Sequence, residues 1–553
     1  MKFFKKSRVI VFTIILALSS FLFFSFEDGD FEIVKNLDIF ATLMKQLNLN
    51  YVDEINSGEL VKTAIDNMLE SLDPYTNFIS EAEVEDYKFM TTGQYGGIGA
   101  MIMKKNDFIV ISDPYEGFPA QKAGLVAGDI LLEVNGKSTK GKNTADVSEL
   151  LKGTPGTEVK IVIKRDGEQK NIEKSIKREE IKINNVLFYS KLKDDIAYIK
   201  LTGFTQNAGI EVKDAYLNLT KNGKLNGLIL DLRGNGGGLL NEAVNIVNIF
   251  VERGQLVVST KGKLRNSNNN HITSNPAVDL DIPIVVLTDA YSASASEIVA
   301  GSLQDIDRAV IIGQKTYGKG LVQNIIPLSY NSQLKVTVAK YYIPSGRCIQ
   351  EIDYSRKNKE GRSEKIADSL KTAFKTKNGR TVYDGGGIIP DIIVETAENI
   401  NILTSLHNKY LIFDFATKFH QKNKSIPAAK EFVISEEIFN DFIKFISEKD
   451  YDYTTKSEQL LNDLKEMAEK EKYFDAVKTE YESLKTKMIH DKTQDIQKFK
   501  EDIKIILRNE IVSRYYYQKG RIESSLNEDK EVLKAIEILN DKQAYKKLLN
   551  PGI

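Results

Sequence analysis

A run of small residues around a hydroxyl group is the first feature of this sequence that could do chemistry. Ser292-Ala293-Ser294-Ala295-Ser296 follows the apolar stretch Ile284–Leu287, which predicts a strand, and opens a segment with helical spacing. The small neighbours would leave room for a substrate carbonyl, and the positive end of a helix would face it. A serine at a helix start is also a common N-cap, so a nucleophile at this place requires a base.

Histidine is the usual partner of a nucleophilic serine, but the histidines of this chain do not fit that role. They lie in polar loops or in the C-terminal helical region, and the chain has no G-x-S-x-G elbow. The four are His271, His407, His420 and His490. A Ser-x-x-Lys pair, Ser190 and Lys193, lacks the companion motifs of the β-lactamase group, so we interpret it as chance.

Lys319 is the better candidate base. It lies in Tyr317-Gly318-Lys319-Gly320, and on a strand its side chain would point to the same face as that of Gln323, whose amide could orient the amine. The aliphatic neighbours Leu321, Ile325 and Ile326 favour a neutral amine. We expect the pKa of Lys319 to fall from about 10.4 to about 7–8, which would make the lysine a usable base.

A glycine loop follows another predicted strand. Ile229-Leu230-Asp231-Leu232 leads into Arg233-Gly234-Asn235-Gly236-Gly237-Gly238. Leu239 stands where a dinucleotide fingerprint needs glycine or alanine, and in Gly313–Thr316 a glutamine splits the Gly-Lys pair of a phosphate loop. Exposed N–H groups at a strand end can instead stabilise an oxyanion, and a plain strand-to-helix turn is the alternative.

The segment from Gly117 to Gly136 resembles the PDZ signature, in which a short helix turns into a strand and a hairpin. A PDZ domain adds a partner's tail to its sheet as an extra strand and holds the terminal carboxylate with backbone N–H groups. Gly97-Ile98-Gly99 fits this carboxylate nest, because glycines let the backbone approach the anion closely. We expect these three residues to bind the substrate tail.

The order of the elements predicts a multidomain α/β protein, and 553 residues leave room for about three or four folded units. Helical spacing, then short strands with turn signals, then alternating strands and helices follow one another along the chain. We expect a signal anchor or signal peptide at 1–27, a helical region at 28–93, a small, mostly β PDZ domain at 94–178, an α/β core at 179–397 and a long helical C-terminal extension at 398–553.

The N-terminus predicts export. Basic residues between Lys2 and Arg8 precede the uncharged apolar stretch Val9–Phe26, which as a helix would span about 27 Å, enough for the hydrocarbon layer. The basic flank should stay in the cytoplasm, which places the chain after Glu27 outside. We expect an uncleaved anchor in the inner membrane, with a cleaved signal as the alternative, and a location on the periplasmic side.

Together and in this order, the motifs resemble those of the carboxy-terminal processing peptidases, tail-specific serine proteases with a PDZ domain and a Ser/Lys dyad. The likeness also includes Tyr342-Ile343-Pro344-Ser345-Gly346-Arg347. It extends from Leu72-Asp73-Pro74-Tyr75 to Gly387-Ile388-Ile389-Pro390-Asp391 and leaves out the helical tail after about Glu398. The resemblance implies that the core at 179–397 is a serine protease core.

The same resemblance implies a role for individual residues. Ser294 corresponds to the nucleophile, Lys319 to the general base and Gln323 to the residue that orients the lysine. The oxyanion donors would be the N–H groups of Ala295 and Gly237. Neither a metal nor another cofactor is expected.

These observations predict a serine endopeptidase that recognises the C-terminal tails of extracytoplasmic proteins and cuts near them through an acyl-enzyme. The alternatives are a non-catalytic PDZ adaptor on an inactive protease fold, against which the intact dyad argues, and a membrane-tethered scaffold built on the C-terminal helices. The expected partners are protein substrates and the membrane, and self-association is left open. With 76 basic and 77 acidic residues, no net field attracts nucleic acid.

Overall fold

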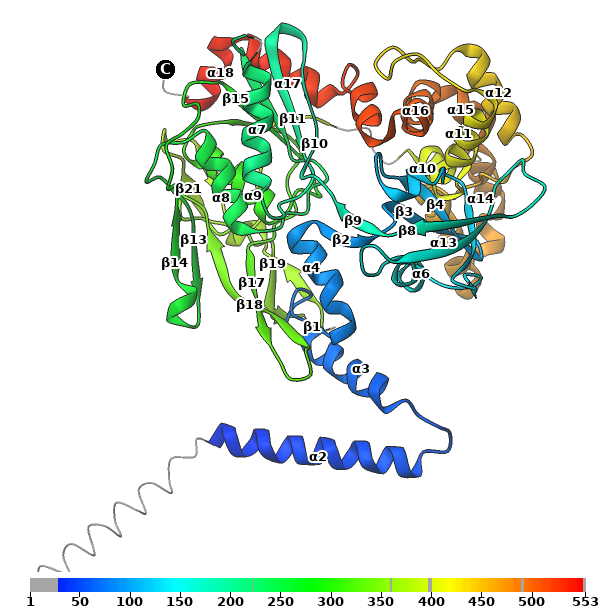
Figure 1. Ribbon diagram of the computed structural model, residues 1–553, viewed down its shortest axis with the longest axis horizontal. Coiled ribbons are helices and arrows are strands. Elements are labelled where there is room, and N and C mark those ends of the chain that lie inside the picture. Colours follow the sequence, from blue (N-terminus) through cyan, green and yellow to red (C-terminus); the bar gives the residue numbers. More distant parts are fainter. Residues whose placement is uncertain (1–27, 222, 359–360, 396–399, 489–491, 551–553) are drawn as a thin grey trace, which may run out of the picture. The chain divides into compact units, whose positions relative to one another are not determined.

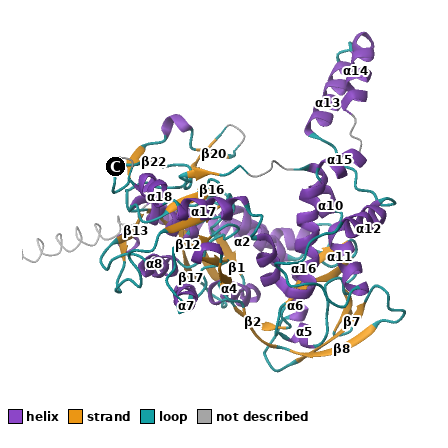
Figure 2. Ribbon diagram, turned by 90° about the horizontal axis from the view of Figure 1, so that it is seen from above, coloured by secondary structure: helices purple, strands orange, loops and turns teal. Residues whose placement is uncertain are grey.

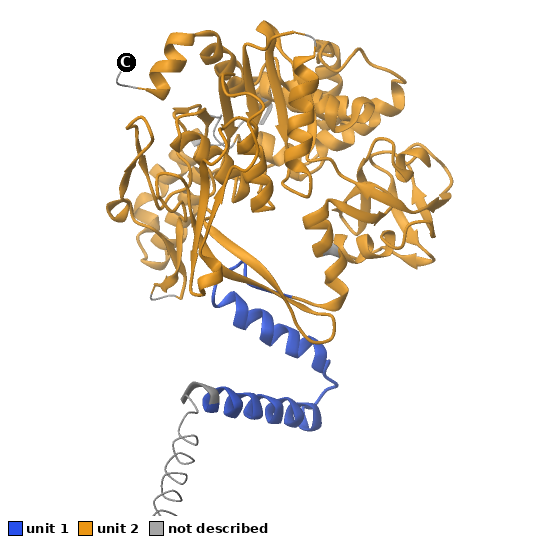
Figure 3. Ribbon diagram, turned by 60° about the vertical axis from the view of Figure 1, so that its left-hand side comes forward, with its two compact units in different colours: residues 1–78 blue, residues 79–553 orange. Residues whose placement is uncertain are grey.

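The computed structural model describes residues 28–221, 223–358, 361–395, 400–488 and 492–550. The chain divides into two compact units, residues 1–78 and 79–553 (Figure 3). The predicted anchor, Val9–Phe26, lies outside the described residues. Within the described ranges, no helix combines the length and the apolar character that crossing a bilayer requires.

The first unit contains the helices that the apolar spacing predicts. These are α2 (Asp28–Asn50) and α3 (Ser57–Glu70). The side chain of Asn56 caps α3, because it accepts hydrogen bonds from the N–H groups of Gly58 and Glu59. The helix ends before Pro74, which could not continue it, and β1 (Asn77–Ile79) includes the boundary between the two units.

The second unit begins with a 3-10 turn, a helix and the sheet that carries the PDZ signature. The sheet is antiparallel, in the order β3-β4-β5-β7-β8, with β6 paired to β5. The elements are η1 (Glu81–Glu83), α4 (Val84–Thr92), β3 (Ala100–Lys105), β4 (Phe108–Pro114), α5 (Pro119–Lys122), β5 (Ile130–Val134), β6 (Lys137–Ser138), α6 (Thr144–Leu151), β7 (Glu158–Lys164) and β8 (Ile172–Lys177). Flanking it, β2 (Gln94–Gly97) pairs with β9 (Glu179–Lys182).

A six-stranded sheet forms the α/β core, in the order β10-β11-β12-β15-β16-β23. Figure 1 labels β10, β11 and β15 of this sheet. All neighbours are parallel except β10 and β11. The strands are β10 (Val186–Lys191), β11 (Ile196–Leu201), β12 (Gly227–Asp231), β15 (Ile284–Thr288), β16 (Val310–Gly313) and β23 (Ile392–Ile393). Their nearly continuous apolar runs reflect burial of both faces.

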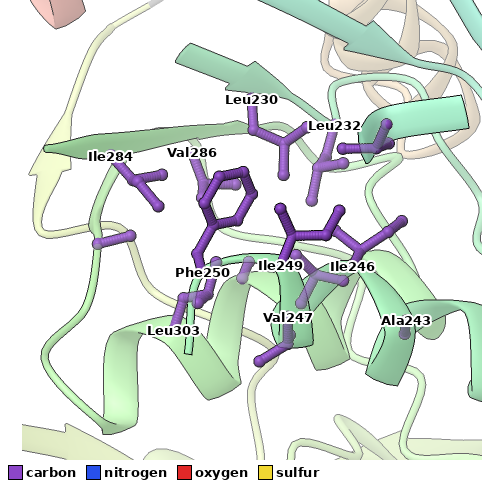
Figure 4. Close-up of a cluster of buried hydrophobic side chains, with 14 of the residues drawn as sticks. Leu230, Leu232, Ala243, Ile246, Val247, Ile249, Phe250, Ile284, Val286 and Leu303 are labelled. Carbon is purple, nitrogen blue, oxygen red and sulfur yellow. The ribbon is translucent and has the colours of Figure 1, made fainter. Parts of the chain in front are cut away.

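One face of this sheet is covered by α7 (Ala208–Thr220), α8 (Leu240–Ile249) and α9 (Ala295–Asp305). Figure 4 shows Leu230 and Val286 of the sheet pointing toward Ile246 and Phe250 of the α8 region and toward Leu303 of α9. This packing fixes the start of α9, where the predicted nucleophile lies.

The other face is covered by α17 (Lys530–Asn540) and α18 (Lys542–Leu549). The alternate residues Ile229, Val285 and Ile312 pack in one buried cluster with Val532 and Leu539 of α17. Figure 2 shows α17 and α18 beside β16. The last part of the helical extension therefore completes the α/β core, which the sequence did not indicate.

A second sheet contains the strand that begins just after the lysine candidate. In it β17 (Leu321–Pro327) pairs with β18 (Gln333–Tyr342), β18 with β13 (Leu256–Gly262), and β13 with β14 (Asn269–Ile272). Two small hairpins are formed by β19 (Ile352–Lys357) with β20 (Ser363–Lys365) and by β21 (Ala373–Lys375) with β22 (Thr381–Tyr383). The remaining 3-10 turns are η2 (Lys193–Asp195), η3 (Arg265–Ser267) and η4 (Asp368–Leu370).

The rest of the extension is helical, as predicted, with a buried core of its own. Its helices are α10 (Asn401–Asn408), α11 (Leu411–Lys422), α12 (Glu436–Ile446), α13 (Lys456–Lys470), α14 (Phe474–Met488), α15 (Lys492–Lys498) and α16 (Lys500–Ser525). Aromatic side chains such as Phe415, Phe439 and Phe442 pack among the aliphatic residues of this core.

Candidate active site

Ser294 is the N-cap of α9 and has an unusual backbone. Its φ is 55° and its ψ is −113°, a combination that residues other than glycine rarely adopt. Such strain persists only where neighbouring contacts hold it, and it is common at catalytic sites. Ser294 is partly exposed, whereas Ser292 and Ser296 are buried, and their hydroxyls donate to the carbonyls of Leu232 and Asn235. Of the three serines, Ser294 is therefore the one that solvent and substrate can reach.

The carboxylate of Glu297 holds the strained turn. It is fully buried, and its Oε2 accepts hydrogen bonds from the N–H groups of Ser294, at 2.8 Å, and Lys319, at 2.9 Å. Its Oε1 accepts from the hydroxyl of Thr316 and from the N–H of Gly318. A single carboxylate thus joins the backbone of the predicted nucleophile to the backbone of the predicted base.

Lys319 lies in the loop that precedes β17, not on a strand as the spacing argument assumed. The N–H groups of Gly318 and Lys319 donate to Glu297, and that of Gly320 donates to the Gln350 side chain. Since these three groups bond to side chains, no strand can form there. Gln323 is on β17, and its amide N–H donates to the hydroxyl of Thr337 at 3.2 Å.

The glycine loop lies directly against the serine turn. The N–H of Ala293 donates to the carbonyl of Asn235, which anchors one loop to the other. A Cβ atom on Gly237, whose φ is +98°, would lie 2.9 Å from the N atom of Ala295, so only glycine fits there. The N–H of Gly237 donates to Oδ1 of Asn235 at 2.9 Å, and Ala295 begins α9, so its N–H is among the first of that helix.

One cavity of about 450 Å³ unites these parts. Its walls come from α4, the glycine loop, the start of α9, the residues from Lys319 to Gln323, and β18. Ser294, Ala295, Gly237, Lys319 and Gln323 all line it, so the structure brings together every residue that the sequence assigned to catalysis or to the oxyanion. Tyr341 adds a contact that was not predicted, because its hydroxyl lies 2.5 Å from the carbonyl of Lys319 and 3.2 Å from that of Ser294.

A network of ion pairs and hydrogen bonds lies at the strand end that leads into the glycine loop. Asp231, which is buried at the end of β12, accepts hydrogen bonds from Tyr198, Lys200 and Arg233. Burial would raise the pKa of Asp231, but the cations of Arg233 and Lys200 outweigh it and lower the pKa well below its usual range. Arg233 also pairs with Glu531 of α17 at 2.5 Å.

The predicted carboxylate nest comprises the last residue of β2, Gly97, and the two residues between β2 and β3. The side chain of Ile98 is buried in the core of the PDZ sheet, and the carbonyls of Ile98 and Gly99 accept from the N–H groups of Ala120 and Tyr115. Among the described strands β3 pairs only with β4, so no strand occupies its other edge, although the hydroxyl of Tyr410 donates to the β3 carbonyl of Lys104. The nest thus precedes an edge strand of the sheet.

Glu297 gives the stability of the protein a specific pH dependence. Burial raises its pKa to about 7, although four hydrogen bonds favour the charged form. Because the folded state holds this proton more tightly than the unfolded state, the free energy of unfolding should fall by about 3 kcal/mol as pH rises from about 4.5 to about 7. Denaturant unfolding at pH 5 and pH 8 should show this loss in the wild type and not in Glu297→Gln, which cannot titrate. Equal pH slopes for the two proteins would contradict this assignment.

The fold and the site define a serine-type peptidase, and the comparisons with known proteins agree. Residues 195–355 match the model of Peptidase family S41, residues 110–165 match a PDZ domain, and residues 402–539 match the model described as "Probable PDZ-protease, C-terminal helical domain". The helical extension, which the motifs left outside the likeness, is thus a recognised part of such proteases.

The chain belongs to the carboxy-terminal-processing protease family of S41 peptidases. It is 36% identical over 321 residues to the carboxy-terminal-processing protease of Bartonella bacilliformis, covering 58% of this chain and 73% of that one. It is 39% identical over 320 residues to a probable CtpA-like serine protease of Staphylococcus aureus, covering 57% of this chain and 62% of that one. A solved photosystem II D1 C-terminal processing protease is 27% identical, with 64% of this chain and 92% of that chain covered and a TM-score of 0.36.

Proposed function

We propose that the chain is an endopeptidase that forms an acyl-enzyme on Ser294 with Lys319 as the general base. The observation that carries this proposal is the single carboxylate, Glu297, that ties the strained Ser294 to the Lys319 loop in one cavity. The alternative of an inactive adaptor does not account for a strained, accessible serine that shares a cavity with a lysine.

In the proposed reaction, Lys319 accepts the proton of the Ser294 hydroxyl as the oxygen attacks the scissile carbonyl carbon. The lysine then gives that proton to the departing amine, and the C–N bond breaks. A water molecule attacks the ester in the second half, giving its proton to Lys319, and the Ser294 oxygen leaves as a hydroxyl when it takes this proton back. Gln323 would orient the amine through its amide oxygen, since its amide N–H is already directed at Thr337.

The developing oxyanion would be held by backbone N–H groups. Ala295 supplies one from the first residue of α9, where the helix dipole also favours negative charge. Gly237 would supply the second, and its N–H would have to turn from Asn235 toward the substrate. The close approach of the two loops supports this pair of donors.

Tail recognition is the second part of the proposal. Gly97, Ile98 and Gly99 would hold the free α-carboxylate of a substrate, whose last residues would add to the outer edge of β3. Gly99 has a φ of +72°, and a Cβ atom there would lie 2.5 Å from the Cβ of Phe118, so this turn is specific for glycine. The match of residues 110–165 to a PDZ domain supports tail recognition by this domain.

Amidation of a substrate's C-terminus should impair its cleavage. Hydrogen bonds to a charged group contribute roughly 1.5–3 kcal/mol, so the apparent affinity should fall about ten- to a hundredfold. The measurement is kcat and KM for matched free-acid and amide substrates. A rise in KM alone would indicate tethering, and a fall in kcat as well would indicate that tail binding switches the site on.

A short chromogenic ester that reaches only Ser294 is the control, and its hydrolysis should not depend on a terminal carboxylate. Equal cleavage of amide and free-acid proteins at every concentration would refute tail recognition and leave the dyad assignment intact.

We also propose that the N-terminal segment anchors the chain and that the protease acts on the outer side of the inner membrane. The basic flank and the apolar stretch Val9–Phe26 support this. Membrane fractionation, with protease accessibility in spheroplasts, would test it. Release of the chain by a salt or carbonate wash would refute the anchor.

A further inference from the structure

Lys335 is a second lysine in the active-site cavity. It lies on β18 opposite Ile325 of β17, two residues from Thr337, which takes the hydrogen bond of Gln323. Side chains two residues apart share a face of a strand, so Lys335 and Thr337 point the same way. Lys335 is partly buried, and its Nζ lies 5.9 Å from the centre of the Tyr87 ring on α4.

The charged side chains that line the cavity all have basic groups. Among the described side chains that line it, the charged groups are Lys319 and Lys335, and neither aspartate nor glutamate is present. Glu297 is not among the residues that line the cavity. Its carboxylate already accepts hydrogen bonds from the N–H groups of Ser294 and Lys319. In the part of the chain that the structure describes, no carboxylate lies within ion-pair distance of Lys335.

A partly buried cation without a counterion costs free energy, and an incoming carboxylate would relieve that cost. Burial accordingly lowers the pKa of Lys335 from its ordinary value. On the proposed function, Lys319 must be neutral to act as a base, which leaves Lys335 as the cation that a bound peptide meets.

We propose that Lys335 is a specificity-determining residue that selects substrates with a carboxylate close to the scissile bond, on the part of the peptide that runs along the β17–β18 hairpin. This inference rests on the proposed function and names its substrate class. The carboxylate comes either from an aspartate or glutamate side chain or from the terminal α-carboxylate of a short substrate.

The test uses the full chain and fluorogenic peptides that share one free-acid tail. Glu, Gln or Lys is placed in turn at each position within four residues of the scissile bond. At one position kcat/KM should be about tenfold or more higher for Glu than for Gln, and lower still for Lys. A second set of Gln peptides is truncated so that the α-carboxylate falls at that position, as free acid and as amide, which distinguishes the two carboxylate sources.

Lys335→Met should abolish the preference for the carboxylate, and Lys335→Glu should reverse it in favour of the Lys peptide. Lys340→Met, which removes an exposed lysine of the same strand, is the matched control and should keep the preference. Equal kcat/KM for the Glu, Gln and Lys peptides at every position would overturn the proposal. A preference for the Glu peptide that persists in Lys335→Met would do the same.

Binding of the same peptides to Ser294→Ala, measured by fluorescence anisotropy, separates this inference from the proposed function. If the wild type cleaves nothing but the Ser294→Ala chain still binds the Glu peptide more tightly than the Gln peptide in a Lys335-dependent way, the catalytic proposal fails and the selectivity stands. If the Ser294→Ala chain bound the Glu and Gln peptides equally well, the proposed role of Lys335 would be overturned.

Discussion

Ser294→Ala and Lys319→Ala should each reduce kcat/KM about a thousandfold or more and leave the fold intact. In the proposed reaction both side chains act in one acylation step, so the double variant should be no worse than either single variant. Ser294 is partly exposed, and the buried hydroxyls of Ser292 and Ser296 make the hydrogen bonds to Leu232 and Asn235, so the Ser294 variant should keep the fold and lose the proposed nucleophile. The measurements are hydrolysis of a tailed substrate, thermal unfolding, and labelling of Ser294 by a fluorophosphonate, which Lys319→Ala should slow.

The neighbouring serines provide matched controls for the dyad variants. Ser292→Ala and Ser296→Ala each remove one buried hydrogen bond between the serine turn and the glycine loop. Each should cost about 1–2 kcal/mol of stability and retain most of the activity. If either of these were the inactivating change and Ser294→Ala remained active, the nucleophile would be wrongly placed.

Glu297→Gln should reduce kcat at least about tenfold, although the side chain touches no substrate. Its carboxylate oxygens receive four donors, and an amide nitrogen in place of one oxygen would face N–H groups that it cannot accept from. The backbone N–H groups of Ser294 and Lys319 would then lose their common acceptor. The strained conformation of Ser294 would lose the contact that holds it. We therefore expect Glu297 to act as a positioning residue.

The readout must separate positioning from stability. Ser302→Ala removes a buried hydrogen bond from the same helix, where the hydroxyl donates to the carbonyl of Val257, and should lower the unfolding temperature without lowering kcat. Glu297→Gln should lower kcat at temperatures where it is fully folded, and should slow labelling of Ser294. Wild-type kcat in the folded Glu297→Gln variant would contradict the positioning role.

The sequence predicted two residues that the structure places in one cavity, because both lie in short local motifs. Ser294 stands between a strand and a helix, and Lys319 between two glycines, so each can be recognised from its neighbours. Glu297 was overlooked, although a glutamate three residues after a capping serine is the signature of a capping box. That spacing could have indicated its bond to the N–H of Ser294, but not its bond to Lys319, which depends on the tertiary fold.

Other features could not be predicted from local patterns. Lys335 is one of many lysines on strands, and only the pairing of β17 with β18 and the position of α4 place it in the cavity. The strand expected around Lys319 is absent because side-chain acceptors compete with the sheet for its N–H groups. The helical extension was correctly predicted as helical, but its polar sequence gave no sign that α17 covers the central sheet.

The pairing of Arg233 with Glu531 joins residues that are 298 positions apart, and this has a consequence for the order of synthesis. A chain emerging from the ribosome carries Ser294, Lys319 and the glycine loop long before α17 exists. Until then the sheet face that contains Ile229, Val285 and Ile312 remains in water, at a cost of roughly 1.5–3 kcal/mol for each such side chain. We therefore expect the nascent chain to have no protease activity until residues 530–540 have been translated and have packed against the central sheet.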